Sequence, residues 1–242
     1  MQTEPATNPR FVTKIEEIRR VTASEVQQGP FKGMTISEQT SWYGGDVIQK
    51  LIGSYECELW DWVEEAVAGA PDMIVNIGCA EGYYAVGMAM RLPSARVHAI
   101  DIDFAALKAC EATARANRAE SNLRLELGWT KASIQNILRQ SGKALLLIDC
   151  EGCEAQIFDL LEPKSYAAAE IIVECHDFAV PGISELLMTK LNKSHETRIL
   201  RTIERKAEDF TILSGQSPDF VAEALSENRP GDMYWIYAKP KS

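Results

Sequence analysis

The stretch VNIGCAEGYY, residues 75–84, joins an apolar run to a helical pattern through a turn that contains two glycines. The run that enters it, MIVNI at 73–77, is short and almost continuously apolar, which is typical of a strand buried on both faces. The residues that leave it predict a helix from Tyr83 to Leu92, ended by Pro93. A strand, a tight turn and a helix in this order predict the first unit of a parallel α/β sheet.

The same alternation continues along the chain. Further strands are predicted at 97–101, 123–127, 144–149 and 170–175, and each is followed by a helical pattern. The tail differs, because apolar segments at 197–204 and 210–214 and the run MYWIYA at 233–238 lack this regular helical spacing. We therefore expect a doubly wound, Rossmann-like, mostly parallel sheet with an antiparallel C-terminal edge.

The first 68 residues do not follow this pattern. They predict an early helix near 14–20 and a second near 55–68, separated by turn-rich sequence that includes SEQTSWYGG at 37–45. The expected division is an N-terminal helical arm at 1–68, which we expect to act as a substrate lid, and a sheet domain at 69–242. The aromatic residues Trp42, Tyr43, Trp60 and Trp129 fit either the core or the wall of an apolar pocket.

Composition limits the classes of partner. The 242 residues are 46% hydrophobic and 25% charged with a net charge of −10, which is typical of a globular protein and argues against a nucleic-acid partner. No run approaches the roughly 18 apolar residues that a membrane span requires. The first residues lack the apolar core of a secretory signal, so we expect a cytoplasmic protein.

The six cysteines do not form the spacing of a disulfide framework. Several lie in apolar runs, where a thiol behaves as a small hydrophobic group. Cys150 and Cys153 form a C-x-x-C pair, but no second pair accompanies them to hold zinc and no thioredoxin-like context surrounds them. The sequence therefore favours structural cysteines.

The turn itself restricts the cofactor. Gly78 allows the sharp exit from the strand, and Gly82 would let the backbone approach a ligand. The spacing is not the G-x-G-x-x-G of dinucleotide sites, and no Gly-Lys-Ser/Thr follows as in a P-loop. Glu81 would also place a negative charge beside phosphates. A cofactor without phosphates fits this turn better than NAD or a nucleotide.

Asp101 ends the second predicted strand, about 20 residues after the turn, where a carboxylate can accept hydrogen bonds from both ribose hydroxyls of an adenosyl group. The competing interpretation is that the glycines form an ordinary strand–helix turn and that Asp101 caps a helix.

Two other strand ends carry unusual chemistry. ALLLIDCEGCE places Asp149, Glu151 and Glu154 after the fourth strand, and EIIVECHD places Glu174 and His176 at the end of the fifth. In a doubly wound sheet the first, fourth and fifth strands are neighbours. Their carboxyl ends are therefore expected to gather these side chains, with Cys79, in one crevice.

These motifs resemble known families. Asn76-x-Gly78-x-Ala80-x-Gly82 resembles the D/E-x-G-x-G-x-G motif of class I S-adenosylmethionine-dependent methyltransferases. The segments L-x-I-D-x-E-G-x-E and I-x-V-E-x-H resemble the FkbM-like family within that class, whose members methylate hydroxyls on natural products and sugars. Asn76 and Asp101 depart from the acid and the glutamate usual there, and the departure at Asn76 puts a strong bond to the cofactor's amino group in doubt.

The resemblance implies the class I methyltransferase fold and S-adenosylmethionine as cofactor. The residues that it implies for cofactor binding are Asn76, Gly78, Cys79, Glu81, Gly82, Asp101, Ile102 and Asp149. The implied reaction is methylation of a hydroxyl on a small-molecule or sugar acceptor.

Two catalytic assignments stay open at this point. His176 could remove the hydroxyl proton with Asp149 beside it, or it could be a structural histidine that orders its loop. Asp149, Glu151 and Glu174 could hold a divalent cation through oxygen ligands, or Glu151 and Glu154 could complement the start of the following helix.

The rival functions are a catalytically silent S-adenosylmethionine-binding sensor or partner protein, and a dehydrogenase, which the missing glycine pattern disfavours. Homo-oligomerisation and the identity of the acceptor are left open by the sequence.

Overall fold

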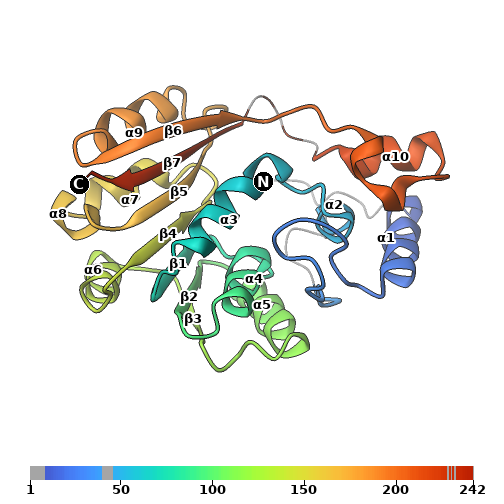
Figure 1. The fold of residues 1–242 in the computed structure, drawn as a ribbon, viewed down its shortest axis with the longest axis horizontal. Coiled ribbons are helices and arrows are strands. Elements are labelled where there is room, and N and C mark those ends of the chain that lie inside the picture. The colour runs from blue at the N-terminus through green and yellow to red at the C-terminus, as the bar shows by residue number, and fades with distance from the viewer. Residues whose placement is uncertain (1–8, 40–45, 228, 230, 232, 242) are drawn as a thin grey trace.

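One seven-stranded sheet runs through the computed structural model, which describes residues 9–39, 46–227, 229, 231 and 233–241 (Figure 1). Trp42, Tyr43 and the glycines at 44 and 45 lie outside the described residues. The strands stand in the order β3-β2-β1-β4-β5-β7-β6. Their bounds are β1 Met73–Ile77, β2 Arg96–Asp101, β3 Leu123–Leu127, β4 Ala144–Ile148, β5 Glu170–Cys175, β6 His195–Arg201 and β7 Tyr234–Pro240.

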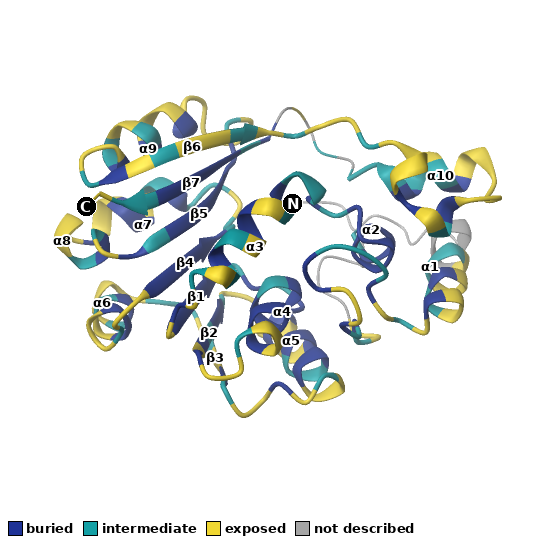
Figure 2. Ribbon diagram, viewed as in Figure 1, coloured by how far each residue is buried: buried dark blue, intermediate teal, exposed yellow. Residues whose placement is uncertain are grey.

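Helices cover both faces of the sheet. The bounds of the α-helices are α1 Pro9–Thr22, α2 Val47–Ile52, α3 Trp60–Ala68, α4 Tyr83–Arg91, α5 Phe104–Ala116, α6 Lys131–Arg139, α7 Glu154–Leu160, α8 Pro163–Tyr166, α9 Ile183–Leu191 and α10 Pro218–Leu225. One core layer combines α1 to α5 and α10 with one face, and the other combines α6 to α9 with the opposite face. The central strands are buried and the outer helices are exposed on one side (Figure 2).

The parallel part of the sheet confirms the sequence prediction. The strands predicted at 73–77, 123–127 and 170–175 have these bounds in the structure, because each is a compact apolar or alternating run bounded by turn residues. β1 pairs in parallel with β2 and β4, and β4 pairs in parallel with β5. The first, fourth and fifth strands are therefore neighbours, as expected.

The C-terminal tail differs in two details from the expectation. β7 is antiparallel to both of its neighbours, and it lies between β5 and β6, so that β6 forms the edge. The apolar segment at 210–214 is not a strand, because Thr211–Leu213 forms a 3-10 helix. Phe210 and Leu213 are buried in the core, and Phe210 packs edge-on against Trp60. Phe210 and Leu213 are therefore apolar because they anchor a loop in the core, and not because they belong to a strand.

The N-terminal arm packs into the same core as the sheet. Ile18, Val26, Phe31 and Ile36 are all buried in the layer that contains α4 and α5. At the far side of the molecule, α2 contacts both α1 and α10 (Figure 1). The second predicted helix begins later than expected, since a 3-10 turn at Cys57–Leu59 precedes α3. The division at residue 68 stays a prediction.

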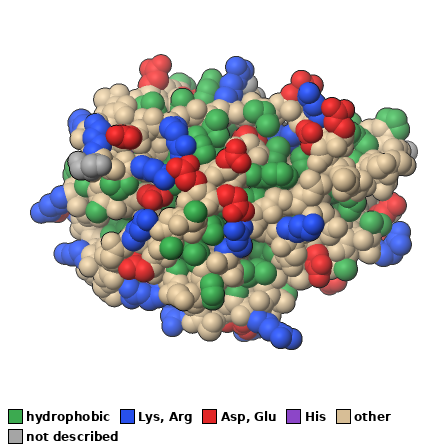
Figure 3. Space-filling view, in the orientation of Figure 1, with side chains coloured by type: hydrophobic (Ala, Val, Ile, Leu, Met, Phe, Trp, Pro, Cys, Tyr) green, Lys and Arg blue, Asp and Glu red, His purple; other side chains and the backbone are tan. Residues whose placement is uncertain are grey.

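The described surface is of mixed charge. Acidic and basic side chains are interspersed over the face shown in Figure 3. Among the helices that the structure describes, none is both long enough and apolar enough to cross a membrane.

Candidate active site at the carboxyl edge of the sheet

A cavity of about 640 Å³ opens at the carboxyl ends of β1, β2, β4 and β5. It collects eight of the eleven residues that the sequence singled out, which are Gly78, Glu81, Asp101, Ile102, Asp149, Glu151, Glu174 and His176. Asn76, Cys79 and Gly82 do not line it. Parallel strands bring their carboxyl ends to one edge, and this explains why motifs far apart in the chain meet here.

The glycine loop, residues 78–82, is held by the end of β2. The backbone N–H groups of Gly78 and Cys79 both donate to the Ile100 carbonyl, at 2.8 and 3.0 Å. The Ala80 N–H donates to Asp101 Oδ2 at 2.9 Å. Ala80 has a φ of +46°, so this alanine adopts a conformation that favours glycine. The loop thus has the backbone shape of a three-glycine turn with an alanine in the middle position.

The two glycines of the loop are required by protein packing. A Cβ at Gly78 would lie 1.5 Å from the Asp149 carbonyl oxygen, so the end of β4 occupies that space. A Cβ at Gly82 would lie 2.8 Å from Cys110 Sγ on α5. Gly82 was expected to let the backbone approach a ligand. In the structure it instead lets the loop pack closely against α5.

Glu81 forms a buried ion pair with Lys50 of α2, a residue that the sequence analysis did not select. Both side chains are at most 6% exposed. Burial lowers the pKa of Lys50, but the carboxylates of Glu81 and Asp46 raise it by more, so the net shift is upward. Lys50 also lies over the ring of Tyr55. Glu81 therefore fixes the arm to the glycine loop.

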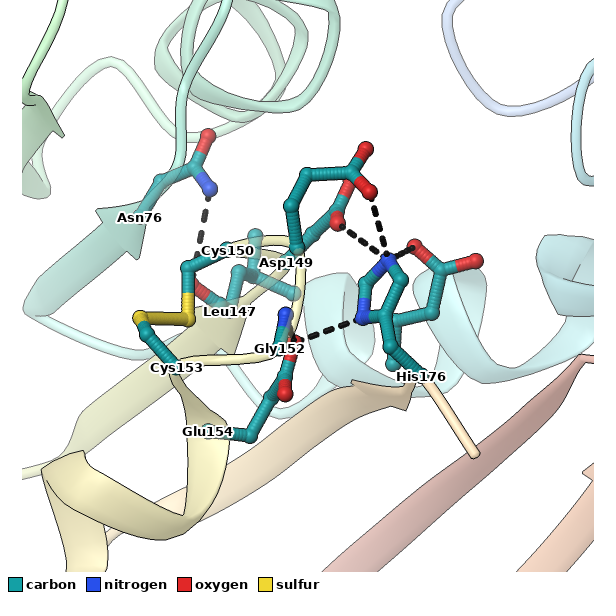
Figure 4. Close-up of a disulfide and its surroundings, with 10 residues drawn as sticks. Asn76, Leu147, Asp149, Cys150, Gly152, Cys153, Glu154 and His176 are labelled. Carbon is teal, nitrogen blue, oxygen red and sulfur yellow. Dashed lines mark hydrogen bonds and ion pairs between the residues drawn. A yellow bond between two sulfur atoms is a disulfide. The ribbon is translucent and has the colours of Figure 1, made fainter. Parts of the chain in front are cut away.

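Asn76 and Cys79 are buried beside the cavity. The Asn76 amide donates to the Leu147 carbonyl at 3.4 Å, while its Oδ1 has no hydrogen-bond partner among the described residues (Figure 4). The pKa of Cys79 is raised, first by a hydrogen bond with Cys110 and then by burial. A role for either residue in binding a cofactor stays a prediction.

Asp101, Ile102 and Trp129 form one end of the cavity. Asp101 accepts from the N–H groups of Ala80 and Asp103, and a carboxylate has about four acceptor positions, so it can accept further bonds. Ile102 is 84% exposed, which is unusual for an isoleucine. This end of the cavity combines a free hydrogen-bond acceptor with apolar surface.

The opposite side of the cavity is rich in carboxylates. We call it the carboxylate wall, and it consists of Glu56, Asp149, Glu151, Glu174 and Glu227 with His176 and Arg229. His176 is 2% exposed, and its Nδ1 bonds to Glu154 Oε1 at 2.6 Å (Figure 4). Its Nε2 lies 3.3 Å from Glu151 Oε2 and 3.6 Å from Asp149 Oδ1 and Glu174 Oε2.

This environment changes the protonation of His176. Burial lowers its pKa, but bonds to Glu151 and Glu154 and the charge of Asp149 raise it by more, to about 10. Burial raises the pKa of Asp149 and of Glu174 above the ordinary values. At neutral pH His176 is therefore an imidazolium, and the half-buried Asp149 and the buried Glu174 are stronger bases than usual.

Arg229 connects the carboxylate wall to the arm. Its guanidinium forms ion pairs with Glu174 of β5, with Glu56 before the 3-10 turn at 2.9 Å, and with Glu227 at 2.6 Å. Burial outweighs the attraction of Arg229 and raises the pKa of Glu56 to about 8. Neither Arg229 nor Glu56 was among the residues predicted for the site. The segment RPGDMYWIYAKP, which begins at Arg229, resembles the tail of the FkbM-like family, but that resemblance did not indicate a role for the arginine.

Two sets of side chains could hold a cation. One consists of Asp149, Glu151 and His176, and the other of Glu56, Asp149 and Glu174, with ligand atoms within 4.8 Å of one another in each set. Oxygen ligands and one imidazole suit a divalent metal. The imidazolium would have to lose its proton to bind through Nε2.

Cys150 and Cys153 are joined by a disulfide bond (Figure 4). The sequence favoured structural cysteines here but did not predict the bond, which forms because the tight turn after β4 brings the two sulfur atoms together. Both residues line the cavity. Cys57, Cys79, Cys110 and Cys175 are free thiols.

Part of the chain matches the model of a known family. The sequence pattern of the family "Methyltransferase small domain" matches residues 63–139, which span α3 to α6 and include the glycine loop and Asp101. None of the curated proteins matches the chain.

Several solved structures are similar. The O-methyltransferase from Bacillus cereus in complex with SAH is 13% identical, with a TM-score of 0.48 over 94% of this chain and 91% of that one. The O-methyltransferase TomG from Streptomyces achromogenes is 12% identical, with a TM-score of 0.48 over 94% and 89%. Cofactor-bound Rv0187 from MTB is 12% identical, with a TM-score of 0.47 over the whole of both chains.

The chain has a doubly wound, mostly parallel sheet with an antiparallel strand near its C-terminal edge, as the sequence predicted. The family match over residues 63–139 is to a methyltransferase domain. The finer FkbM-like assignment stays a prediction.

Proposed function

We propose that the protein is an S-adenosylmethionine-dependent methyltransferase that acts on a hydroxyl of a small molecule or sugar. The observation that carries this proposal is the position of the glycine loop and Asp101 on one cavity, opposite a wall of carboxylates. The family match to residues 63–139 supports the same class.

The cavity has groups that fit this cofactor. The unused acceptor positions of Asp101 suit two ribose hydroxyls, and the exposed Ile102 and the nearby Trp129 suit the faces of an adenine. Among the described residues that line the cavity, the only arginine and lysine are Arg229 and Lys50, and both pair with carboxylates. A ligand without phosphates suits that end better than NAD.

The charge of the cavity suits a cationic cofactor. Eight carboxyl side chains line it, against Lys50, Arg229 and His176 as cations. S-adenosylmethionine would supply a methyl group on a positively charged sulfur. Even with Glu56 protonated at neutral pH, the remaining carboxyl groups outnumber these cations, and carboxylates lower the free energy of a cationic ligand in a partly desolvated site.

Asp149 is the proposed acceptor for the hydroxyl proton. It lines the cavity, its Oδ1 has no hydrogen-bond partner among the described residues, and burial raises its pKa. His176 is already protonated at neutral pH, so it cannot take up a proton in that state. We propose that the imidazolium instead orients Asp149 and Glu174 from behind.

Calorimetry with S-adenosylhomocysteine and, separately, NAD tests the proposal. We expect binding of the sulfur ligand alone, and Asp101→Asn should weaken it about tenfold or more, because one charged acceptor is lost. Asp103→Asn is the matched control, since it removes a carboxylate two residues away that only caps α5. Binding of NAD without the sulfur ligand would refute the proposal.

Turnover separates an enzyme from a silent binder. Asp149→Asn should retain cofactor binding and lose about 100-fold or more in kcat with a hydroxylated acceptor, since the proposed base is removed. Binding without turnover on any hydroxylated acceptor would favour the sensor or partner protein.

A metal can be tested on the same protein. EDTA treatment followed by Mg²⁺ addition should switch turnover off and on if either carboxylate set holds a cation. Activity that is unaffected by EDTA would show that neither set of side chains holds a metal ion that turnover needs.

A further inference from the structure

The loop that carries the disulfide also carries three partners of His176. Asp149 precedes Cys150, Glu151 lies within the Cys150–Cys153 ring, and Glu154 directly follows it. Glu151 lies 3.3 Å from His176 Nε2, and Glu154 lies 2.6 Å from Nδ1. Figure 4 shows the disulfide beneath Asp149 and next to the segment that leads to Glu154. A change in this ring would therefore act first on Glu151, on the Nε2 side of the imidazole.

The ring holds an unusual backbone. Glu151 has a φ of +55°, although it is not a glycine, and Gly152 follows with a φ of +101°. A residue such as glutamate adopts this conformation at a cost, and it persists only where the surroundings impose it. Glu151 and Gly152 are the two residues enclosed by the Cys150–Cys153 bond, so opening that bond would remove a covalent restraint on this conformation.

The disulfide is poorly placed to stabilise the fold. It joins residues three apart, and a short ring removes little freedom from the unfolded chain. A bond of this kind between partly exposed sulfurs at a cavity is the type that reacts readily with other thiols. Both cysteines are half-buried and line the cavity, so a small reductant can reach them.

The other cysteines are less suited to the same reaction. Burial raises the pKa of Cys57 to about 11 and also raises the pKa of Cys175, and a hydrogen bond with Cys110 raises that of Cys79. Since the thiolate is the reactive form, these three thiols react slowly near neutral pH. Thiol–disulfide exchange is therefore expected at the Cys150–Cys153 pair in preference to Cys57, Cys79 and Cys175.

We propose that Cys150 and Cys153 are a reversible thiol–disulfide site that sets the position of Glu151 and thereby the arrangement of the carboxylate wall around His176. The reaction partner is a dithiol, either a small molecule or a protein with a pair of neighbouring thiols. One thiolate of the dithiol attacks the S–S bond to form a mixed disulfide, and its second thiolate displaces the remaining sulfur. Two electrons and two protons pass to the pair, which becomes two thiols, and the dithiol becomes a disulfide.

The proposal does not depend on methyl transfer. Its first test is to count reactive thiols in the folded full-length protein after treatment with dithiothreitol and after re-oxidation with glutathione disulfide. We expect the reduced protein to gain two thiols, mapped by alkylation and mass spectrometry to Cys150 and Cys153. A pair that stays reduced in glutathione disulfide, or that dithiothreitol cannot open, would overturn the proposal.

The second test follows His176 by NMR in both states of the wild-type protein. Asp149, Glu151, Glu154 and Glu174 face its ring, and Phe178 packs against it. Reduction should release Glu151 alone, so the pKa of His176 should fall by about one unit. The His176→Gln protein assigns the signal among the three histidines. Equal titration curves in the two states would contradict the proposed link.

Three variants separate the bond from the carboxylate. The double variant Cys150→Ser/Cys153→Ser should titrate like the reduced protein whatever the redox conditions, and Cys57→Ser should keep the wild-type response. Glu151→Gln should keep the thiol–disulfide reaction but lose the redox effect on His176. A redox effect that persists in Glu151→Gln would show that the loop acts through another residue and would overturn the proposed role of Glu151.

Discussion

The two sides of the cavity are built in different ways. The glycine loop and Asp101 lie within 24 residues of sequence, at 78–101, and their hydrogen bonds are mostly to backbone groups of β2. The carboxylate wall combines Glu56, Asp149, Glu174 and Arg229 from four separate parts of the chain, and side-chain ion pairs hold it together. The loop side therefore depends on backbone shape, and the wall depends on charge balance.

This difference predicts which kind of substitution disrupts each side. A small change of volume should disrupt the loop, whereas its charge is of secondary importance. A change of charge should disrupt the wall, and pH should modulate the damage. Four substitutions test the contrast.

The largest effect is expected at Gly78→Ala. The new Cβ would lie 1.5 Å from the Asp149 carbonyl oxygen, so β1 and β4 would have to separate, at a cost above about 4 kcal/mol. Gly33→Ala is the matched control, because its φ of +85° is close to the +82° of Gly78 and nothing lies within 4 Å of the added atom. The control should lose only about 1–2 kcal/mol. Urea unfolding measures both, and similar losses would contradict the packing argument.

Arg229→Met should have the next largest effect, a loss of about 3–5 kcal/mol at pH 9, since Glu56, Glu174 and Glu227 lose their shared cation. The loss should shrink at pH 6.5, because Glu56, whose pKa is about 8, and Glu174, whose pKa is also raised, are protonated there in the folded state.

Arg198→Met removes an exposed ion pair with Glu65, and it should cost less than about 1 kcal/mol at either pH. Unfolding curves at the two pH values measure both arginine variants. A loss for Arg229→Met that does not change with pH would argue that packing, and not charge, explains the role of Arg229.

His176→Gln should cost less, about 2 kcal/mol at pH 7, because it removes hydrogen bonds between charged groups. The pKa of His176 is about 10 in the folded protein, against an ordinary value of 6.5 that applies in the unfolded chain. Its contribution is therefore complete below about pH 6.5 and is lost as pH rises through 10. Urea unfolding of wild type and variant should converge near pH 10.5, and a constant difference would contradict the assignment of the imidazolium.

The smallest effect is expected at Ala80→Gly. Relief of the positive φ is offset by the greater freedom of glycine in the unfolded chain, so stability should change by less than about 1 kcal/mol. Affinity for S-adenosylhomocysteine should stay within about twofold of the wild type. A large loss of affinity would show that the alanine methyl group itself contacts the ligand.

Much of the fold was predictable from local patterns. The strands at 73–77, 123–127 and 170–175 are short runs bounded by turn residues, and Asp103 caps α5 as its position predicted. The apolar segment at 210–214 was misread as part of a sheet edge because burial under a loop and burial in a sheet demand the same residue types. Periodicity alone cannot separate the two cases.

The sequence by itself determined the sheet, the glycine loop, and the gathering of Asp101, Asp149, Glu174 and His176 at one edge, because parallel strands place their carboxyl ends together. Only the tertiary structure decided the partners of these residues: Lys50 on Glu81, Arg229 on Glu56 and Glu174, and four carboxylates around His176. The physical reason is that side-chain charge pairing acts through space between segments that no local pattern connects, and this pairing sets the protonation of the site.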